Sequence, residues 1–160
     1  MEKLNKITYV KGDATNPIGE GVKIITHIVN NRRAWGAGFV LALSRKWPEP
    51  EDNYRMYAPN SLRLGTVDYV MVESISPRNK IFVANMVAQH GTGKDANGDI
   101  PLRYTALTDC LRNVNEMAEF LGASVHMPMI GAGLAGGDWN TIEQIIRETI
   151  KVPVTVYQLK

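Results

Sequence analysis

The stretch V-H-M-P-M-I-G-A-G-L-A-G-G-D-W, from Val125 to Trp139, joins a predicted strand to a glycine-rich loop and the start of a helix. The strand covers Val125–Met129, and four glycines follow between Gly131 and Gly137. Glycine is costly to order, so this loop is expected where the backbone must approach something closely. The exposed N–H groups of the loop and the helix start that follows it favour an anion such as phosphate.

A second segment of this kind occurs earlier in the chain. An apolar strand, Val22–Val29, runs into the asparagine pair Asn30 and Asn31, and the following loop ends at Gly38 before a helix. A single glycine loop is also explained as a tight turn that serves packing. Two such loops in one short chain favour a diphosphate that is held from both sides.

The rest of the chain alternates apolar, β-branched segments with helical patterns, which is typical of an α/β domain around a parallel or mixed sheet. Ligands of such sheets bind outside the carboxyl ends of the strands. A capping box of Asn140 with Glu143 is expected to begin the last helix, and Gly122 to end the one before it. We predict strands over Ile7–Val10, Val22–Val29, Val67–Glu73, Ile81–Val87, Val125–Met129 and Val152–Leu159, and helices over Phe39–Trp47, Pro50–Tyr57, Arg103–Leu121 and from about Asn140 onward.

Length and composition indicate an ordinary globular protein. The 160 residues suit one domain, 44% are hydrophobic, and no apolar run approaches the length of a membrane span. We expect a cytoplasmic monomer, because the amino terminus lacks a secretory signal and the single cysteine, Cys110, has no partner for a disulfide. The net charge of +2 gives no case for nucleic acid, and the pairs Arg32-Arg33 and Arg45-Lys46 are expected to be solvated surface.

Two better-known phosphate motifs are near matches. Gly131 to Gly136 fits the dinucleotide fingerprint G-x-G-x-x-G, but only 24 residues follow it, too few for the further α/β units of a dehydrogenase. The segment A-Q-H-G-T-G-K-D resembles a P-loop, with Ala88 in place of the first glycine and Asp95 in place of the hydroxyl that holds Mg²⁺. We reject the P-loop and disfavour the dehydrogenase, although the glycine segment can still hold phosphate in the same way.

Five polar side chains are candidates for chemistry, and each has a structural alternative. Asp13 follows the first strand and fits either an Asx turn or a contact to an exocyclic amine. His27 is either a buried strand residue or a proton donor just before the first glycine loop. His126 fits a structural role, and His90 lies in a loop that can reach a ligand. Asp138 is either the cap of the last helix or a catalyst.

Four segments together resemble the macrodomain family along nearly the whole chain. They are G-D-A-T at Gly12–Thr15, the asparagine loop that ends in Gly-Ala-Gly, the segment P-M-I-G-A-G-L-A-G-G-D-W, and R-Y-x-A-L at Arg103–Leu107. The resemblance is strongest to the branch that contains ADP-ribose 1″-phosphate phosphatases. It implies a single macrodomain over residues 1–160, with a three-layer α/β/α fold, a central mixed sheet, and metal-independent binding of ADP-ribose without a cofactor.

The resemblance also implies roles for individual residues. Asp13 would bind the adenine amino group, with Ala14 beside it and Tyr157 near the ring. In phosphatase-like members, a histidine at the position of His27 and an acid near the second loop lie close to the terminal phosphate. The implied catalytic set is therefore His27, Asn30 and Asp138. The remaining implied ligand contacts are Asn30, Asn31, Gly36, Ala37 and Gly38 in the first loop, and Gly131, Ala132, Gly133, Leu134, Ala135 and Gly136 in the second.

One family mechanism is not supported by the sequence. Hydrolases that remove ADP-ribose from glutamate use a lysine near the Val87–Ala88 position and an aspartate after the loop leucine, where this chain has Ala135. We therefore predict a phosphatase that acts on ADP-ribose 1″-phosphate. A non-catalytic reader of ADP-ribose, or a hydrolase of other ADP-ribosyl adducts, is the alternative.

Overall fold

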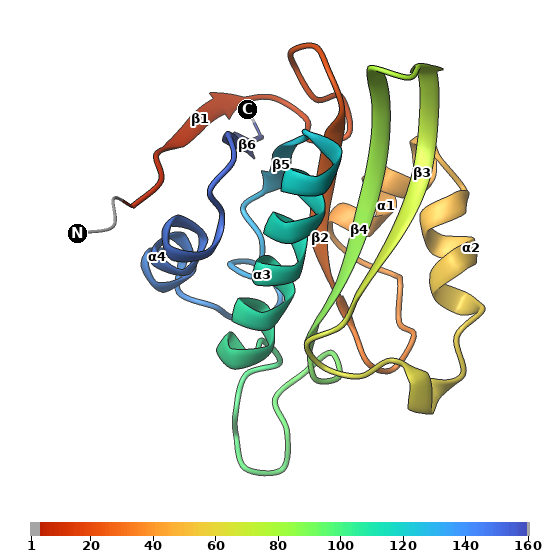
Figure 1. Ribbon diagram of the computed structural model, residues 1–160. Helices are drawn as coiled ribbons and strands as arrows, with labels where there is room; N and C mark the ends of the chain where they lie inside the picture. The colour runs from red at the N-terminus through yellow and green to blue at the C-terminus, as the bar shows by residue number, and fades with distance from the viewer. Residues whose placement is uncertain (1–3, 160) are drawn as a thin grey trace.

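One mixed sheet of six strands lies at the centre of the protein, in the order β1-β6-β5-β2-β4-β3 (Figure 1). The computed structural model describes residues 4–159, apart from the side chain of Pro59. Neighbouring strands from β1 to β4 in this order run parallel, and β3 pairs antiparallel with β4. The strands are β1 Ile7–Lys11, β2 Lys23–Asn30, β3 Val67–Ser76, β4 Asn79–Gln89, β5 Ser124–Pro128 and β6 Val154–Gln158.

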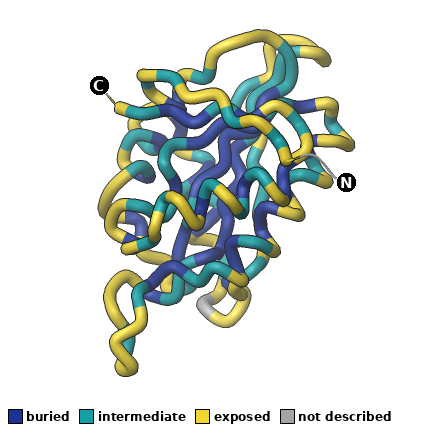
Figure 2. The backbone as a smooth tube through the Cα atoms, turned by 90° about the vertical axis from the view of Figure 1, so that its left-hand side faces the viewer, coloured by how far each residue is buried: buried dark blue, intermediate teal, exposed yellow. Residues whose placement is uncertain are grey.

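Helices cover both faces of the sheet, which gives the predicted three layers (Figure 1). On one face, α1 and α2 pack over a cluster that contains Ile25, Leu43 and Tyr54. On the other face, α3 and α4 pack over a larger cluster that contains Leu107 and Ile146. Figure 2 shows the buried backbone gathered in the centre and the exposed backbone around it. The helices are α1 Phe39–Lys46, α2 Glu49–Arg55, α3 Tyr104–Leu121 and α4 Trp139–Thr149, with a short 3-10 helix η1 at Pro59–Ser61.

The structure confirms the predicted α/β fold with a mixed sheet, and each predicted strand and helix forms within a few residues of its expected bounds. Gly122 ends α3 with φ of 66°, in the left-handed region that favours glycine. The capping box of Asn140 with Glu143 was wrong. The N-cap of α4 is Asp138, two residues before the expected Asn140. The Asp138 carboxylate accepts a hydrogen bond from the Thr141 N–H.

No helix among residues 4–159 is long and apolar enough to cross a membrane.

Candidate functional site

A cavity of about 920 Å³ opens at the carboxyl ends of the strands. Its size lies within the usual range of small-molecule sites, about 300–1,000 Å³. Residues from β1, β5, β6, α1 and the second glycine loop form its walls. They are Lys11, Gly12, Asp13, Ala14, Gly38, Phe39, Ala42, Arg45, Pro128, Met129, Ala132, Gly133, Tyr157, Gln158 and Leu159.

The strand order sets the order of side chains along this edge of the sheet. Since β1, β6, β5, β2 and β4 are parallel, their carboxyl ends form a row of about 19 Å at about 4.8 Å per strand. Asp13 follows the first of these strands, Met129 the third, and His90 the last. An elongated ligand laid along the row therefore meets the Asp13 turn at one end, the glycine loops in the middle and His90 at the other end.

At the first end, Asp13 forms an Asx turn and Tyr157 forms a wall. The Asp13 Oδ1 accepts hydrogen bonds from the Thr15 N–H at 2.9 Å and the Thr15 hydroxyl at 2.8 Å. The side chain is nevertheless exposed and lines the cavity. Asp13 can therefore form the Asx turn and still contact a ligand, because the turn holds its carboxylate at the cavity wall.

A chain of hydrogen bonds holds Tyr157 in place. Its hydroxyl accepts from the Ile18 N–H at 3.0 Å and lies 2.7 Å from the His126 Nδ1. Burial raises the pKa of Tyr157 and lowers the pKa of His126 to about 4, so the hydroxyl donates to a neutral ring. The other ring nitrogen then donates to the Ser124 hydroxyl at 2.8 Å. His126 thus has the structural role that the sequence favoured.

Asn30 organises the first glycine loop instead of facing the cavity. Its amide nitrogen donates to the Ala34 carbonyl at 2.9 Å, and its side-chain oxygen accepts from the N–H groups of Arg32 and Ala34. The buried Tyr54 hydroxyl donates to the Asn30 carbonyl at 2.5 Å. These bonds fold the chain back directly after β2, at a register shift in the β2–β4 pairing.

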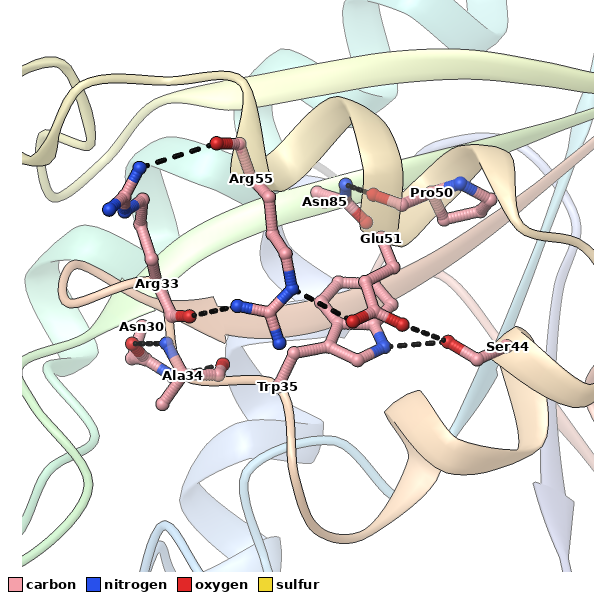
Figure 3. Close-up of polar contacts among 9 residues, drawn as sticks. All are labelled: Asn30, Arg33, Ala34, Trp35, Ser44, Pro50, Glu51, Arg55 and Asn85. Atoms are coloured by element: carbon pink, nitrogen blue, oxygen red, sulfur yellow. Dashed lines mark hydrogen bonds and ion pairs between the residues drawn. The ribbon is translucent and has the colours of Figure 1, made fainter.

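The outer side of this loop is tied to α2 (Figure 3). Arg33 adopts φ of 59°, which is rare for a residue other than glycine. Its carbonyl accepts from the Arg55 guanidinium at 3.1 Å, and its own guanidinium donates to the Arg55 carbonyl at 3.3 Å. Glu51 joins the network by accepting from Arg55 at 2.8 Å and from Ser44 at 2.9 Å. Together, these contacts of Arg33, Ser44, Glu51 and Arg55 hold the outer side of the loop against α2.

Two glycines of the first loop, and the alanine between them, have no such side-chain anchors. Gly36, Ala37 and Gly38 are exposed, and Gly38 lines the cavity. Gly38 has φ of 80° and is the N-cap of α1, so the helix N-terminus is presented at the cavity wall.

At Gly137, the second glycine loop is held by contacts that leave no room for a side chain. The Gly137 N–H donates to the Gly131 carbonyl at 2.7 Å, and a Cβ at Gly137 would lie 2.4 Å from the Leu102 side chain. Ala132 and Gly133 line the cavity, whereas Leu134 is 74% exposed outside it. Ala135 is buried and its carbonyl accepts from the Leu102 N–H at 3.3 Å. Gly131 and Gly136 shape the loop with positive φ values of 73° and 78°.

His27 lies outside the cavity, in the core beneath α1. Its ring is 1% exposed and packs against Trp35 and Phe39, and Phe39 lines the cavity. The Asn85 amide donates to the Pro50 carbonyl, so its oxygen faces the His27 Nε2 at 2.5 Å and accepts from it. Burial lowers the pKa of His27 to about 4. The ring is therefore neutral at pH 7, and its one proton is engaged by Asn85.

Asp138 also lies outside the residues that line the cavity. Its Oδ2 accepts from the Thr141 N–H at 3.1 Å and the Thr141 hydroxyl at 2.8 Å, and its own N–H donates to the Tyr104 hydroxyl. The geometry is that of a helix cap.

The far end of the row, beyond the residues that line the cavity, brings Asn31 and His90 together. The Asn31 amide nitrogen donates to the His90 Nδ1 at 2.9 Å, while its oxygen accepts from the Gly91 N–H at 3.0 Å. The Asn31 amide is thus oriented by two partners. A ring that accepts at Nδ1 carries its proton on Nε2. Among residues 4–159 the Nε2 has no hydrogen-bond partner, so this N–H is available to a ligand.

Sequence reasoning missed the part of the cavity wall that α1 supplies. Phe39, Ala42 and Arg45 all line it, together with Gly38. Their spacing of three or four residues is the repeat of one helix face. That spacing is visible in the sequence, but it indicates a face without saying what the face contacts.

Comparison with solved structures finds relatives that match this chain over nearly its full length and theirs. No family model matches the chain. A solved structure from Bacteroides thetaiotaomicron, described as a protein of unknown function, is 51% identical, with a TM-score of 0.89 and coverage of 96% of this chain and 98% of that one. A macrodomain protein from Streptomyces coelicolor is 43% identical, with a TM-score of 0.80 and coverage of 95% and 98%.

Among curated proteins, a relative from Candida albicans named ADP-ribose 1″-phosphate phosphatase is 28% identical over 158 residues, which are 94% of this chain and 98% of that one. Two other curated relatives are far longer. The chain spans only 17% and 14% of the length of the first two that it matches.

Proposed function

The chain belongs to the macrodomain family, and on that premise we propose that it binds ADP-ribose in the cavity and hydrolyses ADP-ribose 1″-phosphate at the His90 end. The observation that carries the proposal is the placement of two glycine loops on either side of one cavity, with Gly38 from one and Gly133 from the other. The name and full-length match of the Candida albicans relative support the choice of substrate.

The ligand lies along the row of strand ends. Adenine sits between the Asp13 carboxylate, which accepts from the exocyclic amine, and the Tyr157 ring. The diphosphate lies between the start of α1 and the second loop, where the backbone N–H groups near Ala132 and Gly133 stabilise its charge. This orientation directs the distal ribose and its 1″-phosphate toward Asn31 and His90.

Hydrolysis requires water at phosphorus and a proton for the departing 1″ oxygen of ribose. As the bond between phosphorus and the 1″ oxygen breaks, the attacking water supplies this proton. We assign to the His90 Nε2–H a hydrogen bond that stabilises the charge developing on the departing oxygen, and Asn31 orients this N–H through its hydrogen bond to Nδ1. His27 is the weaker donor, because it is buried and its proton is engaged by Asn85. Asn30 acts on the loop and Asp138 on α4, so both contribute by holding the glycine loops in position.

Phosphate release by the purified protein tests this proposal. We expect turnover of ADP-ribose 1″-phosphate in the presence of EDTA, since no step uses a metal. His90→Ala removes this donor and should lower kcat about 100-fold or more, in keeping with the usual loss when one hydrogen bond to developing charge is removed. His27→Gln should alter kcat much less. Absence of phosphate release by the unmodified protein, or a kcat lost with His27 and kept without His90, would contradict the assignment.

A reader without turnover is the second candidate function, and one observation favours it. Among residues 4–159, Asp13 is the only carboxylate that lines the cavity, and it follows β1, whereas His90 follows β4 at the opposite end of the row of parallel strands. No acid is therefore placed to activate water. Calorimetry that shows micromolar binding of ADP-ribose, combined with no release of phosphate, would support the reader.

A hydrolase of ADP-ribosyl adducts through a lysine is disfavoured. Val87 and Ala88 are 3% and 0% exposed within β4, and Ala135 is 6% exposed, so the positions that carry this chemistry elsewhere in the family are apolar and buried. A panel of ADP-ribosylated substrates would separate this activity from the phosphatase.

A further inference from the structure

Two cationic side chains line the cavity without a partner. Arg45 comes from the last turn of α1 and Lys11 from the end of β1. Within residues 4–159, neither side chain has a hydrogen-bond or ion-pair partner. The adjacent Lys46 is different, because its ammonium donates to the Thr15 carbonyl at 2.5 Å and lies over the Trp47 ring. The sequence predicts that both residues of this pair are solvated. In the structure, Lys46 is held by Thr15 and Trp47, whereas Arg45 lines the cavity.

The geometry of α1 places Arg45 at the Asp13 end of the cavity. Gly38 and Arg45 are seven residues apart, which puts them on one helix face about 10 Å from each other along the axis. The contact of Lys46 with Thr15 shows that this end of α1 adjoins the Asp13 turn. Lys11 precedes that turn by two residues. Both cations therefore border the end that the proposed function gives to adenosine.

Adenosine itself does not account for these charges. Its base and ribose are neutral, and the diphosphate already has Gly38 and the second loop about 10 Å away. The single acid of this wall, Asp13, is engaged by Thr15. A guanidinium with no protein partner at the wall of a cavity is suited to a phosphate, which it binds through two parallel N–H bonds.

We propose that Arg45 and Lys11 form a subsite for a phosphate on the adenosine ribose, so that the protein prefers ADP-ribose 2′-phosphate to ADP-ribose itself. The inference rests on the proposed function, because that function sets the orientation of the ligand. One ribose separates the diphosphate of such a ligand from its 2′-phosphate, which matches the distance along α1 between Gly38 and Arg45.

Titration calorimetry with three ligands tests the subsite. The experiment compares ADP-ribose, ADP-ribose 2′-phosphate and ADP-ribose 1″-phosphate. The last two carry the same groups and differ only in which end of the molecule bears the extra phosphate. We expect the 2′-phosphate to bind at least tenfold more tightly than ADP-ribose. Arg45→Gln should abolish this preference while leaving the affinity for the 1″-phosphate isomer within about twofold, and Lys11→Gln should reduce the preference in part.

Arg112→Gln is the matched control, since Arg112 is exposed on α3, away from the cavity, and the same charge is lost. It should leave all three affinities unchanged. The subsite is refuted if the 2′-phosphate binds no better than ADP-ribose, or if Arg45→Gln weakens all three ligands equally. Retained binding of ADP-ribose in those cases leaves the proposed function standing. A failure of ADP-ribose to bind at all overturns both proposals.

Discussion

At the scale of single residues, the three histidines have three different environments. His27 is sealed beneath α1 and His126 supports the Tyr157 hydroxyl, whereas His90 keeps an N–H available at the end of the site. The sequence shows each of them near a strand and cannot rank them, because burial depends on segments far away in the chain. For His27 the deciding neighbours are Phe39 and Asn85.

The two buried histidines predict a loss of stability in mild acid. Burial is the main cause that lowers both pKa values to about 4, and the charge of Lys23 adds to it for His126. In the unfolded chain both rings titrate near their ordinary pKa of about 6.5. At pH 5 the unfolded state therefore binds more protons, so the free energy of unfolding falls between pH 7.5 and pH 5, by about 2 kcal/mol for each ring.

Urea unfolding at the two pH values measures this change. The carboxyl groups with lowered pKa values, Glu51 and Asp95, act below this window. His27→Gln removes one titrating ring and should roughly halve the pH dependence, whatever it does to stability at pH 7.5. Equal free energies of unfolding at pH 7.5 and pH 5 would show that the rings are not buried as described.

At the scale of elements, the start of α4 decides the role of Asp138. Asp138→Ala removes the acceptor for the Thr141 N–H and should lower the free energy of unfolding by about 1 kcal/mol. Since Thr141 engages the carboxylate in capping α4, phosphate release should be nearly unchanged below the unfolding temperature. A large loss of kcat with unchanged stability would instead make Asp138 a catalyst.

The second glycine loop offers a pair of glycines with opposite expectations. A Cβ at Gly137 would lie 2.6 Å from the Gly131 carbonyl oxygen, whereas a Cβ at Gly133 would meet nothing within 4 Å. Gly137→Ala should therefore lower the free energy of unfolding by about 1–3 kcal/mol. Gly133→Ala should leave it within about 0.5 kcal/mol, but weaken ADP-ribose binding, because its methyl group enters the cavity.

Thermal unfolding and calorimetry on the two alanine variants check this contrast. The account is contradicted if Gly137→Ala is as stable as the unmodified protein, or if Gly133→Ala binds ADP-ribose with unchanged affinity. Either result would mean that the loop is not packed, or not aligned with the ligand, as the structure indicates.

At the scale of the whole molecule, the spacing of apolar residues predicts the strands and helices, whereas the order of the strands in the sheet decides which residues meet at the site. The strands and helices are readable from apolar spacing, and the two loops from their glycines. The order β1-β6-β5-β2-β4-β3 cannot be read in this way, because it pairs the first strand with the last through backbone hydrogen bonds between residues that are more than 140 positions apart in sequence. That pairing places Asp13 beside Tyr157.

The same long-range order explains the polar residues whose placement differs from the sequence expectation. His27 stands just before a glycine loop in sequence, yet the side chain points into the core, where Trp35 and Phe39 cover it. Arg45 is in a basic pair that has every feature of solvated surface, yet α1 carries it along the cavity wall. In both cases tertiary packing decides which side of the element is functional.

A crystal structure with ADP-ribose tests the central claim most directly. We predict adenine between Asp13 and Tyr157, the diphosphate within hydrogen-bond distance of backbone N–H groups near Ala132 and Gly133, and the distal ribose directed toward Asn31 and His90. A saturated crystal with an empty cavity, or a ligand with its adenine at the His90 end, would contradict the account.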